Sequence, residues 1–135
     1  MSVMPRAADI VLPILRADLP NEVTVQTWGA DIDYREFPII NIRSVGGVHH
    51  DRRPLQLSKP VIEMTAYTSE DLPTTEQLYM DALEVLFNAV RTQRQTDAGY
   101  LHSIKETMGM TQFSSLFQDS WRVQGLIQLG VRPSV

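Results

Sequence analysis

The sequence predicts an α+β domain: a mixed or antiparallel β-sheet with a long amphipathic helix and an N-terminal helix packed on one face. Strand-like stretches with period two occur in runs before and after one long stretch of period 3.6, whereas a doubly wound fold alternates single strands with helices. With 135 residues, the chain is long enough for one hydrophobic core and contains no obvious linker. We therefore expect a single domain over residues 1–135.

The first half of the chain carries one helical pattern and two strand patterns. Residues 5–19 place apolar side chains at helical spacing among charged ones, which predicts a short amphipathic helix bent at Pro13. Residues 22–28 ("EVTVQTW") and 37–45 ("FPIINIRSV") alternate with period two and predict two strands. We expect the two glycines at 46–47 to end the second strand.

The second half begins with a third strand pattern, "PVIEMTAYT" at residues 60–68. The apolar period then changes to 3.6, which predicts a long amphipathic helix that begins near Asp71. Either Asp71 or Thr74 can cap this helix, because both residue types accept hydrogen bonds from backbone N–H groups of a first turn. Residues 100–108 and 119–131 predict two closing strands.

Composition restricts the possible function classes. The net charge of −4 and pI near 5.3 argue against a general affinity for nucleic acid or anionic lipid, which requires a surplus of Lys and Arg. The sequence has no cysteine, so disulfides, thiolate metal sites and cysteine nucleophiles are excluded. The apolar run "IVLPIL" near the N-terminus is too short to span a membrane, and we expect a cytoplasmic product.

The stretch His49-His50-Asp51 is the most suggestive chemical cluster, but it is a poor chelate. Adjacent histidines in an extended segment point in different directions, whereas metal ligands on one short element prefer i, i+2 or i, i+4 spacing. The third histidine, His102, lies on a different predicted strand. No serine stands in a nucleophile-elbow context and no glycine motif precedes a helix. We therefore expect no catalytic residue, no metal and no cofactor.

Charge is distributed unevenly along the chain. Residues 43–59 contain four basic side chains and one acid, whereas residues 63–84 contain six acids and no Lys or Arg. These segments are either ordinary solvated surfaces or the two sides of a heterologous contact. In the second case, a basic arm of one copy binds the acidic face of the next, and such a contact generates a ring if the rotation closes.

Two loops are expected to project from the domain, at residues 46–59 and 108–119. The second loop is too long for a tight hairpin turn and carries large apolar side chains, which usually mark a binding surface when exposed. The candidate assembly residues are Arg43, His49, His50, Asp51, Arg52, Arg53, Lys59, Glu70, Asp71, Glu76, Met110, Phe113, Leu116 and Phe117.

The layout of the chain resembles the tail terminator, or tail completion, proteins of long-tailed siphophages, especially those that infect actinobacteria. The resemblance covers nearly the whole chain and rests on the N-terminal helix and on five further segments: "EVTVQTWGAD", "IRSVGG", "SKPVIEMTAYTSED", "TTEQLYMDALEVLFNAV" and "WRVQGLIQLGVRP". The most informative part is "IRSVGG" followed by a charged loop, a strand led by proline and a long amphipathic helix.

This resemblance implies a structural virion protein and no enzymatic activity. The implied subunit forms a hexameric ring that caps the tail tube at the head-proximal end of the tail and stops tube polymerisation. The implied partners are other copies of the chain, the tail tube protein and the head-completion or connector protein. Genomic DNA would pass through the lumen without specific binding, and no membrane is involved.

Three other functions remain open from the sequence. A head-tail connector, or neck, protein would share the ring geometry one layer higher in the virion. A small metal-dependent enzyme would use His49, His50 or His102 with a nearby carboxylate. A nucleic-acid-binding module would use the basic arm, and its DNA binding would depend steeply on salt.

Overall fold

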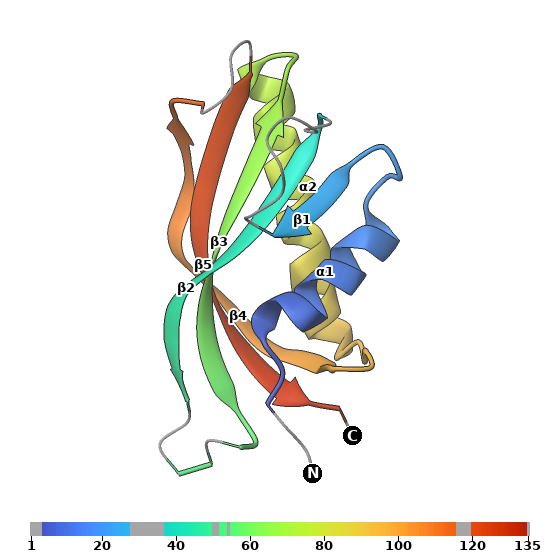
Figure 1. The fold of residues 1–135 in the computed structure, drawn as a ribbon, viewed down its shortest axis with the longest axis vertical. Helices are drawn as coiled ribbons and strands as arrows, with labels where there is room; N and C mark the ends of the chain where they lie inside the picture. The colour runs from blue at the N-terminus through green and yellow to red at the C-terminus, as the bar shows by residue number, and fades with distance from the viewer. Residues whose placement is uncertain (1–3, 28–36, 50–51, 54, 116–119, 135) are drawn as a thin grey trace.

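The computed structural model describes residues 4–27, 37–49, 52–53, 55–115 and 120–134 and has the predicted α+β architecture (Figure 1). Two helices and five strands occur in the described part of the chain. In chain order they are α1 (Ala7–Asp18), β1 (Thr24–Thr27), β2 (Ile39–His49), β3 (Ser58–Thr68), α2 (Leu72–Thr92), β4 (Gly99–Phe113) and β5 (Trp121–Pro133).

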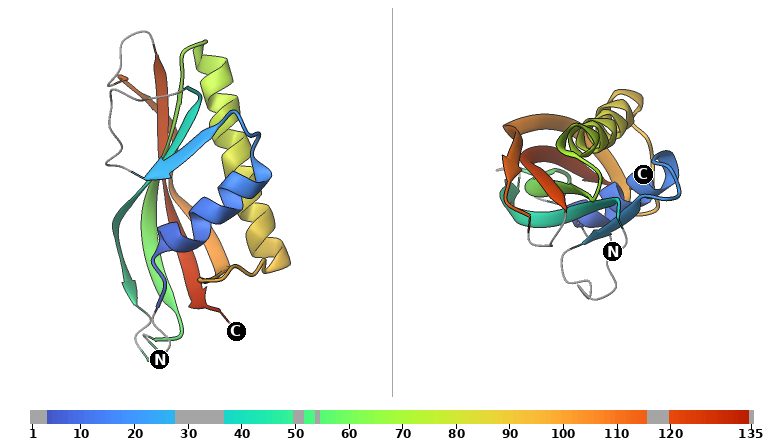
Figure 2. Two further views of the ribbon diagram at one scale, coloured as in Figure 1. Left: turned by 45° about the vertical axis from the view of Figure 1, so that its right-hand side comes forward. Right: turned by 90° about the horizontal axis from the view of Figure 1, so that it is seen from above.

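The five strands form one mixed sheet in the order β1-β2-β3-β5-β4. The short edge strand β1 runs parallel to β2, and the other three pairings are antiparallel. Both helices lie on the same side of this sheet (Figure 2), as the sequence predicts. Neither helix in the described part of the chain has the length and apolar character needed to cross a membrane.

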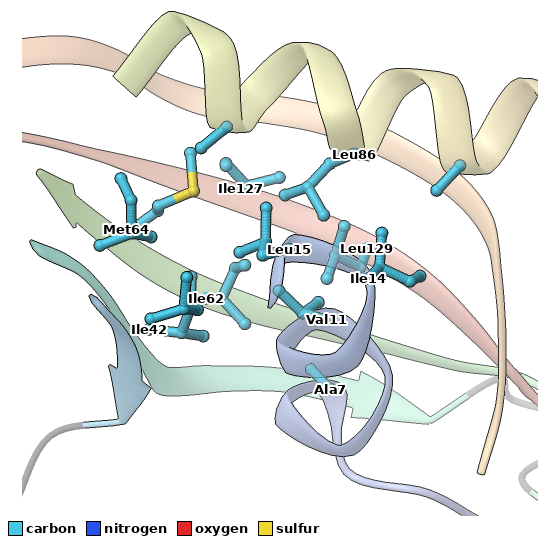
Figure 3. Packing of buried hydrophobic residues seen from close by; sticks show 14 of the residues in the cluster. Ala7, Val11, Ile14, Leu15, Ile42, Ile62, Met64, Leu86, Ile127 and Leu129 are labelled. Carbon is cyan, nitrogen blue, oxygen red and sulfur yellow. The ribbon is translucent and has the colours of Figure 1, made fainter. Parts of the chain in front are cut away.

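The hydrophobic core lies between the helices and the sheet (Figure 3). Val11 and Ile14 of α1 are almost completely buried, as is Leu86 of α2. The sheet contributes inward-facing residues from its central strands, among them Ile62 and Ile127, both 0% exposed. Pro13 is exposed on α1, and the helix continues through it from Ala7 to Asp18.

The start of α2 is fixed by its N-cap residue, Asp71. The Asp71 Oδ1 atom accepts a hydrogen bond from the backbone N–H of Thr74 at 2.7 Å, so the first of the two predicted caps is the one used. Hydrogen bonding from Thr74, first from its side chain and then from its backbone N–H, lowers the pKa of the Asp71 carboxyl, because it stabilises the ionised form.

A close approach between α2 and β5 requires glycine at position 125. A Cβ atom at Gly125 would lie 2.0 Å from the Tyr79 hydroxyl oxygen and 2.9 Å from the Met108 carbonyl oxygen. The Tyr79 side chain is buried, and its hydroxyl has no hydrogen-bond partner among the described residues. Burial, with a smaller effect from the charge of Glu106, raises the pKa of Tyr79 to about 12.

The predicted end of β2 at the glycine pair is wrong. β2 continues to His49, and its pairing with β3 shifts register between Ser44 and Gly47. Gly46 and Gly47 have φ angles of +119° and +118°, which glycine tolerates at a bulge without the steric cost that other residues have. The glycine pair therefore permits positive φ inside a strand and does not end it.

The second projecting loop also begins later than predicted. β4 extends to Phe113, so residues 108–113 belong to a strand that pairs with β5. The pairing shifts register at three places between Leu101 and Thr111, and these shifts interrupt the period-two pattern on which the prediction depends. Of the predicted loop 46–59, residues 46–49 and 58–59 are strand, and of the predicted loop 108–119, residues 108–113 are strand.

Candidate assembly surfaces

The basic arm is the part of the β2–β3 hairpin that extends beyond the core, and its described residues are 43–49, 52–53 and 55–60. All seven β2 residues from Arg43 to His49 are exposed. Gly47 is needed at the bulge, because a Cβ atom there would lie 2.4 Å from both the Lys59 carbonyl oxygen and the Pro60 Cα atom. The close contact between the backbones of β2 and β3 at this bulge therefore fixes the direction of the arm.

The described surface of the arm combines basic and apolar side chains. Arg52, Arg53 and Lys59 are exposed, and the Arg53 guanidinium donates to the Gln56 side chain at 3.4 Å. Val48 is 62% exposed and Leu55 is 68% exposed. Large exposed apolar groups beside cations are typical of a surface that binds another protein.

Arg43 differs from the other basic residues that the sequence singled out. Its guanidinium forms an ion pair with Glu63 on the neighbouring strand, with 3.1 Å between Nη2 and Oε2. The two residues face each other in the β2–β3 register, so this is a cross-strand pair within one subunit. His49 is exposed at the end of β2, whereas His50 and Asp51 lie outside the described residues.

The acidic groove is an open hollow of about 500 Å³ between the end of α1 and the start of α2. Its apolar lining includes Leu19, Val23, Phe37 and Leu78. The charged residues that line it are Glu22, Glu70 and Asp81, with no Lys or Arg among the described residues of its wall. The groove thus presents carboxylates around an apolar floor.

The carboxylates of the groove differ in their partners. Asp81 accepts a hydrogen bond from the Gln77 side chain at 2.8 Å. For Glu22 and Glu70, no side-chain hydrogen bond or ion pair occurs with any of the described residues. A shallower hollow beside the groove shares Asp81 and adds Asp18, which is already paired with Arg94 at 2.6 Å.

The basic arm and the acidic groove lie at opposite ends of the molecule. In Figure 1 the far ends of β2 and β3 lie at the bottom, whereas α2 begins at the top, where Glu70 and the cap Asp71 precede it. The rotated view in Figure 2 (left) gives the same vertical arrangement. The subunit is therefore electrostatically polar along its long axis.

The remaining candidate residues that the structure describes lie outside both the basic arm and the acidic groove. Glu76 lies on α2 outside the groove lining and is partly exposed. Met110 packs against the edge of the core, whereas the exposed Phe113 ring lies under the Arg122 guanidinium, with 5.2 Å between Cζ and the ring centroid. Leu116 and Phe117 lie outside the described residues.

Sequence reasoning missed the groove because its residues come from three separate segments, 19–23, 37–38 and 68–81. Glu22 belongs to the turn after α1, Phe37 precedes β2, Glu70 precedes α2 and Asp81 lies within α2. The acid-rich run at 63–84 was a partial signal, since it contains two of the three groove acids. In the described part of the chain, no three His, Asp or Glu side chains are placed to hold a metal ion.

Comparison with known proteins identifies the family. Residues 3–135 match the model of a family described as phage tail termination protein. The Gene 22 protein of Mycobacterium phage L5 is 59% identical over 133 residues, which cover 98% of this chain and 96% of that protein. The Gene 22 protein of Mycobacterium phage D29 is 58% identical over 134 residues, with the same coverage. This chain therefore belongs to the phage tail termination protein family, a family of structural proteins of the phage tail.

Proposed function

We propose that this protein forms a hexameric ring on the head-proximal end of the tail tube, stops tube polymerisation there and joins the tail to the head-completion complex. Membership of the tail termination family is the observation that carries this proposal. The ring, its copy number and its position at the head-tail junction are the parts that go beyond the family description.

The polarity of the subunit supports a ring. A basic surface at one end and an acidic surface at the other are complementary between copies but not within one copy. A contact between two different surfaces is heterologous, and repeated heterologous contacts close into a ring when the rotation permits. An isologous dimer in which either surface paired with its own copy would instead place like charges against each other.

The overall charge supports the passage of DNA through the ring. With a net charge of −4, the subunit lacks the surplus of Lys and Arg that non-specific phosphate binding requires. We propose that the arginines of the basic arm contact protein, so that the lumen does not retain DNA during its passage.

The test is electron microscopy of the purified protein mixed with isolated tail tubes and with polymerising tube subunits. We expect rings with sixfold symmetry at one end of each tube, and shorter tubes as the amount of added protein rises. The control is the same mixture without this protein, in which tube length should not be limited. A monomer that ignores tubes at every concentration would contradict the proposal, and rings that bind only head connectors would favour the neck-protein alternative.

A further inference from the structure

The acidic groove contains carboxylates with no Lys or Arg among the described residues that line it. Glu22 and Glu70 line it with no hydrogen bond or ion pair to their side chains from the described residues. Carboxylates on the rim of an apolar hollow repel one another, and a guanidinium relieves that repulsion by binding carboxylate oxygens in a fork geometry. The groove therefore fits a basic ligand that also carries an apolar group.

The tip of the basic arm has this combination of groups. We define the arm tip as the described residues Arg52, Arg53, Leu55 and Gln56. Leu55 is 68% exposed, and burial of an apolar side chain of this size stabilises a contact. The two arginines stand two and three residues before it, which brings charge and apolar surface to one place.

The arm tip and the groove cannot meet within one subunit. The seven exposed residues of β2 lead away from the core over roughly 20 Å, in the direction opposite to the start of α2. The far end of β2 and the start of β3 are held by backbone pairing at Gly47, Val48 and His49, so the arm does not fold back. An arm tip that binds this groove must therefore belong to another molecule.

We infer that the acidic groove is the socket for the arm tip of an adjacent copy in the ring, an inference that rests on the proposed function. Leu55 of one copy packs on the apolar floor formed by Val23 and Leu78 of the next. Arg52 and Arg53 bind Glu22 and Glu70 at its rim. The interface has a desolvated apolar centre and charged edges, which is the usual composition of a specific contact.

Cross-linking tests this inference, because the chain has no cysteine of its own. Gln56→Cys labels the arm tip and Gln77→Cys labels the groove wall, and both positions are exposed. Gln95→Cys is a matched control, since Gln95 is also exposed but lies beyond the opposite end of α2. The singly substituted proteins are mixed in equal amounts on tail tubes and treated with a short bismaleimide.

We expect a covalent dimer from the Gln56→Cys and Gln77→Cys mixture, with a yield about tenfold higher than from the mixture with Gln95→Cys. A chain carrying both Gln56→Cys and Gln77→Cys should give a ladder up to the full ring. Rings on tubes without the Gln56–Gln77 cross-link would overturn the inference and leave the proposed function standing. Absence of rings from every unmodified sample would overturn both.

A charge exchange gives a second, independent readout. Arg52→Glu with Arg53→Glu, or Glu22→Lys with Glu70→Lys, should each weaken ring formation by about tenfold at low salt, equivalent to about 1.4 kcal/mol per contact. A chain with all four substitutions should recover most of that loss, because the charges are complementary again. Failure of the combined variant to recover, with the subunit folded, would overturn the pairing of these residues.

Discussion

The two halves of β2 have the same backbone pairing and opposite surroundings. Residues Ile39–Ile42 are all buried, whereas Arg43–His49 are all exposed, although both halves are antiparallel to β3. The buried half contributes apolar area to the core, which is the main source of folding free energy. The exposed half adds little to folding. Its length, its bulge and its surface chemistry are better explained by contact with another molecule.

The largest loss of folding stability is expected from Gly125→Ala, a substitution in the buried part of the sheet. The added Cβ would overlap the Tyr79 hydroxyl at 2.0 Å and approach the Met108 carbonyl oxygen at 2.9 Å, so the buried Tyr79 side chain or the backbone around it must shift. We expect the free energy of unfolding to fall by about 3 kcal/mol, measured by chemical denaturation.

A second substitution shows whether the overlap is the cause. Tyr79→Phe removes the hydroxyl oxygen, and in the Gly125→Ala background it should restore part of the lost stability. Gly109→Ala is a matched control in β4, because its Cβ would meet no atom within 4 Å. Equal losses for Gly125→Ala and Gly109→Ala would show that the close approach does not matter.

A smaller effect on folding is expected from Gly47→Ala in the basic arm. The new Cβ would meet the backbone of Lys59 and Pro60 at 2.4 Å, and the φ angle of +118° is strained for alanine. We expect faster amide hydrogen exchange at Val48 and His49 and weaker capping of tail tubes, while exchange in α2 is unchanged. Loss of protection throughout the core would contradict the separation of the two halves.

The smallest effect on folding stability is expected from Tyr79→Phe, and it appears only at alkaline pH. Tyr79 has a pKa raised from 10.0 to about 12 in the folded state, so its contribution to stability is present below pH 10 and is lost as pH rises toward 12. The free energy of unfolding of the Tyr79→Phe variant should therefore fall less steeply over this range. Tyr67, whose pKa burial also raises, is present in both proteins and provides the common background. Identical pH profiles would argue against a buried, ionisable Tyr79.

The sequence predicts the elements whose patterns are regular over their whole length. Both helices follow one apolar period, the strand predicted at 60–68 lies within β3, and the cap Asp71 is a local signal. The extensions of β2 and β4 contain bulges. A bulge interrupts the alternation of side chains between the two faces, but the strand continues beyond it. A single sequence does not distinguish glycine at a bulge from glycine at a turn.

The assembly surfaces were predictable only in part. The basic arm is contiguous in the chain, so the charge of residues 52, 53 and 59 is visible in the sequence itself. The acidic groove joins Glu22 to Glu70 and Asp81 through the packing of α1 against α2, and no local pattern brings them together. Sequence proximity groups Arg43 with the arm, whereas its position opposite Glu63 is a property of strand register.

The central claim is that the exposed half of the β2–β3 hairpin serves assembly and not folding. Parallel measurement of unfolding free energy and tube capping for Arg52→Glu with Arg53→Glu tests it most directly. The account predicts little change in unfolding, because ion pairs of exposed side chains contribute about 1 kcal/mol or less, together with a strong loss of capping at low salt. Equal capping by the variant and the unmodified protein, or a loss of stability as large as that of Gly125→Ala, would contradict it.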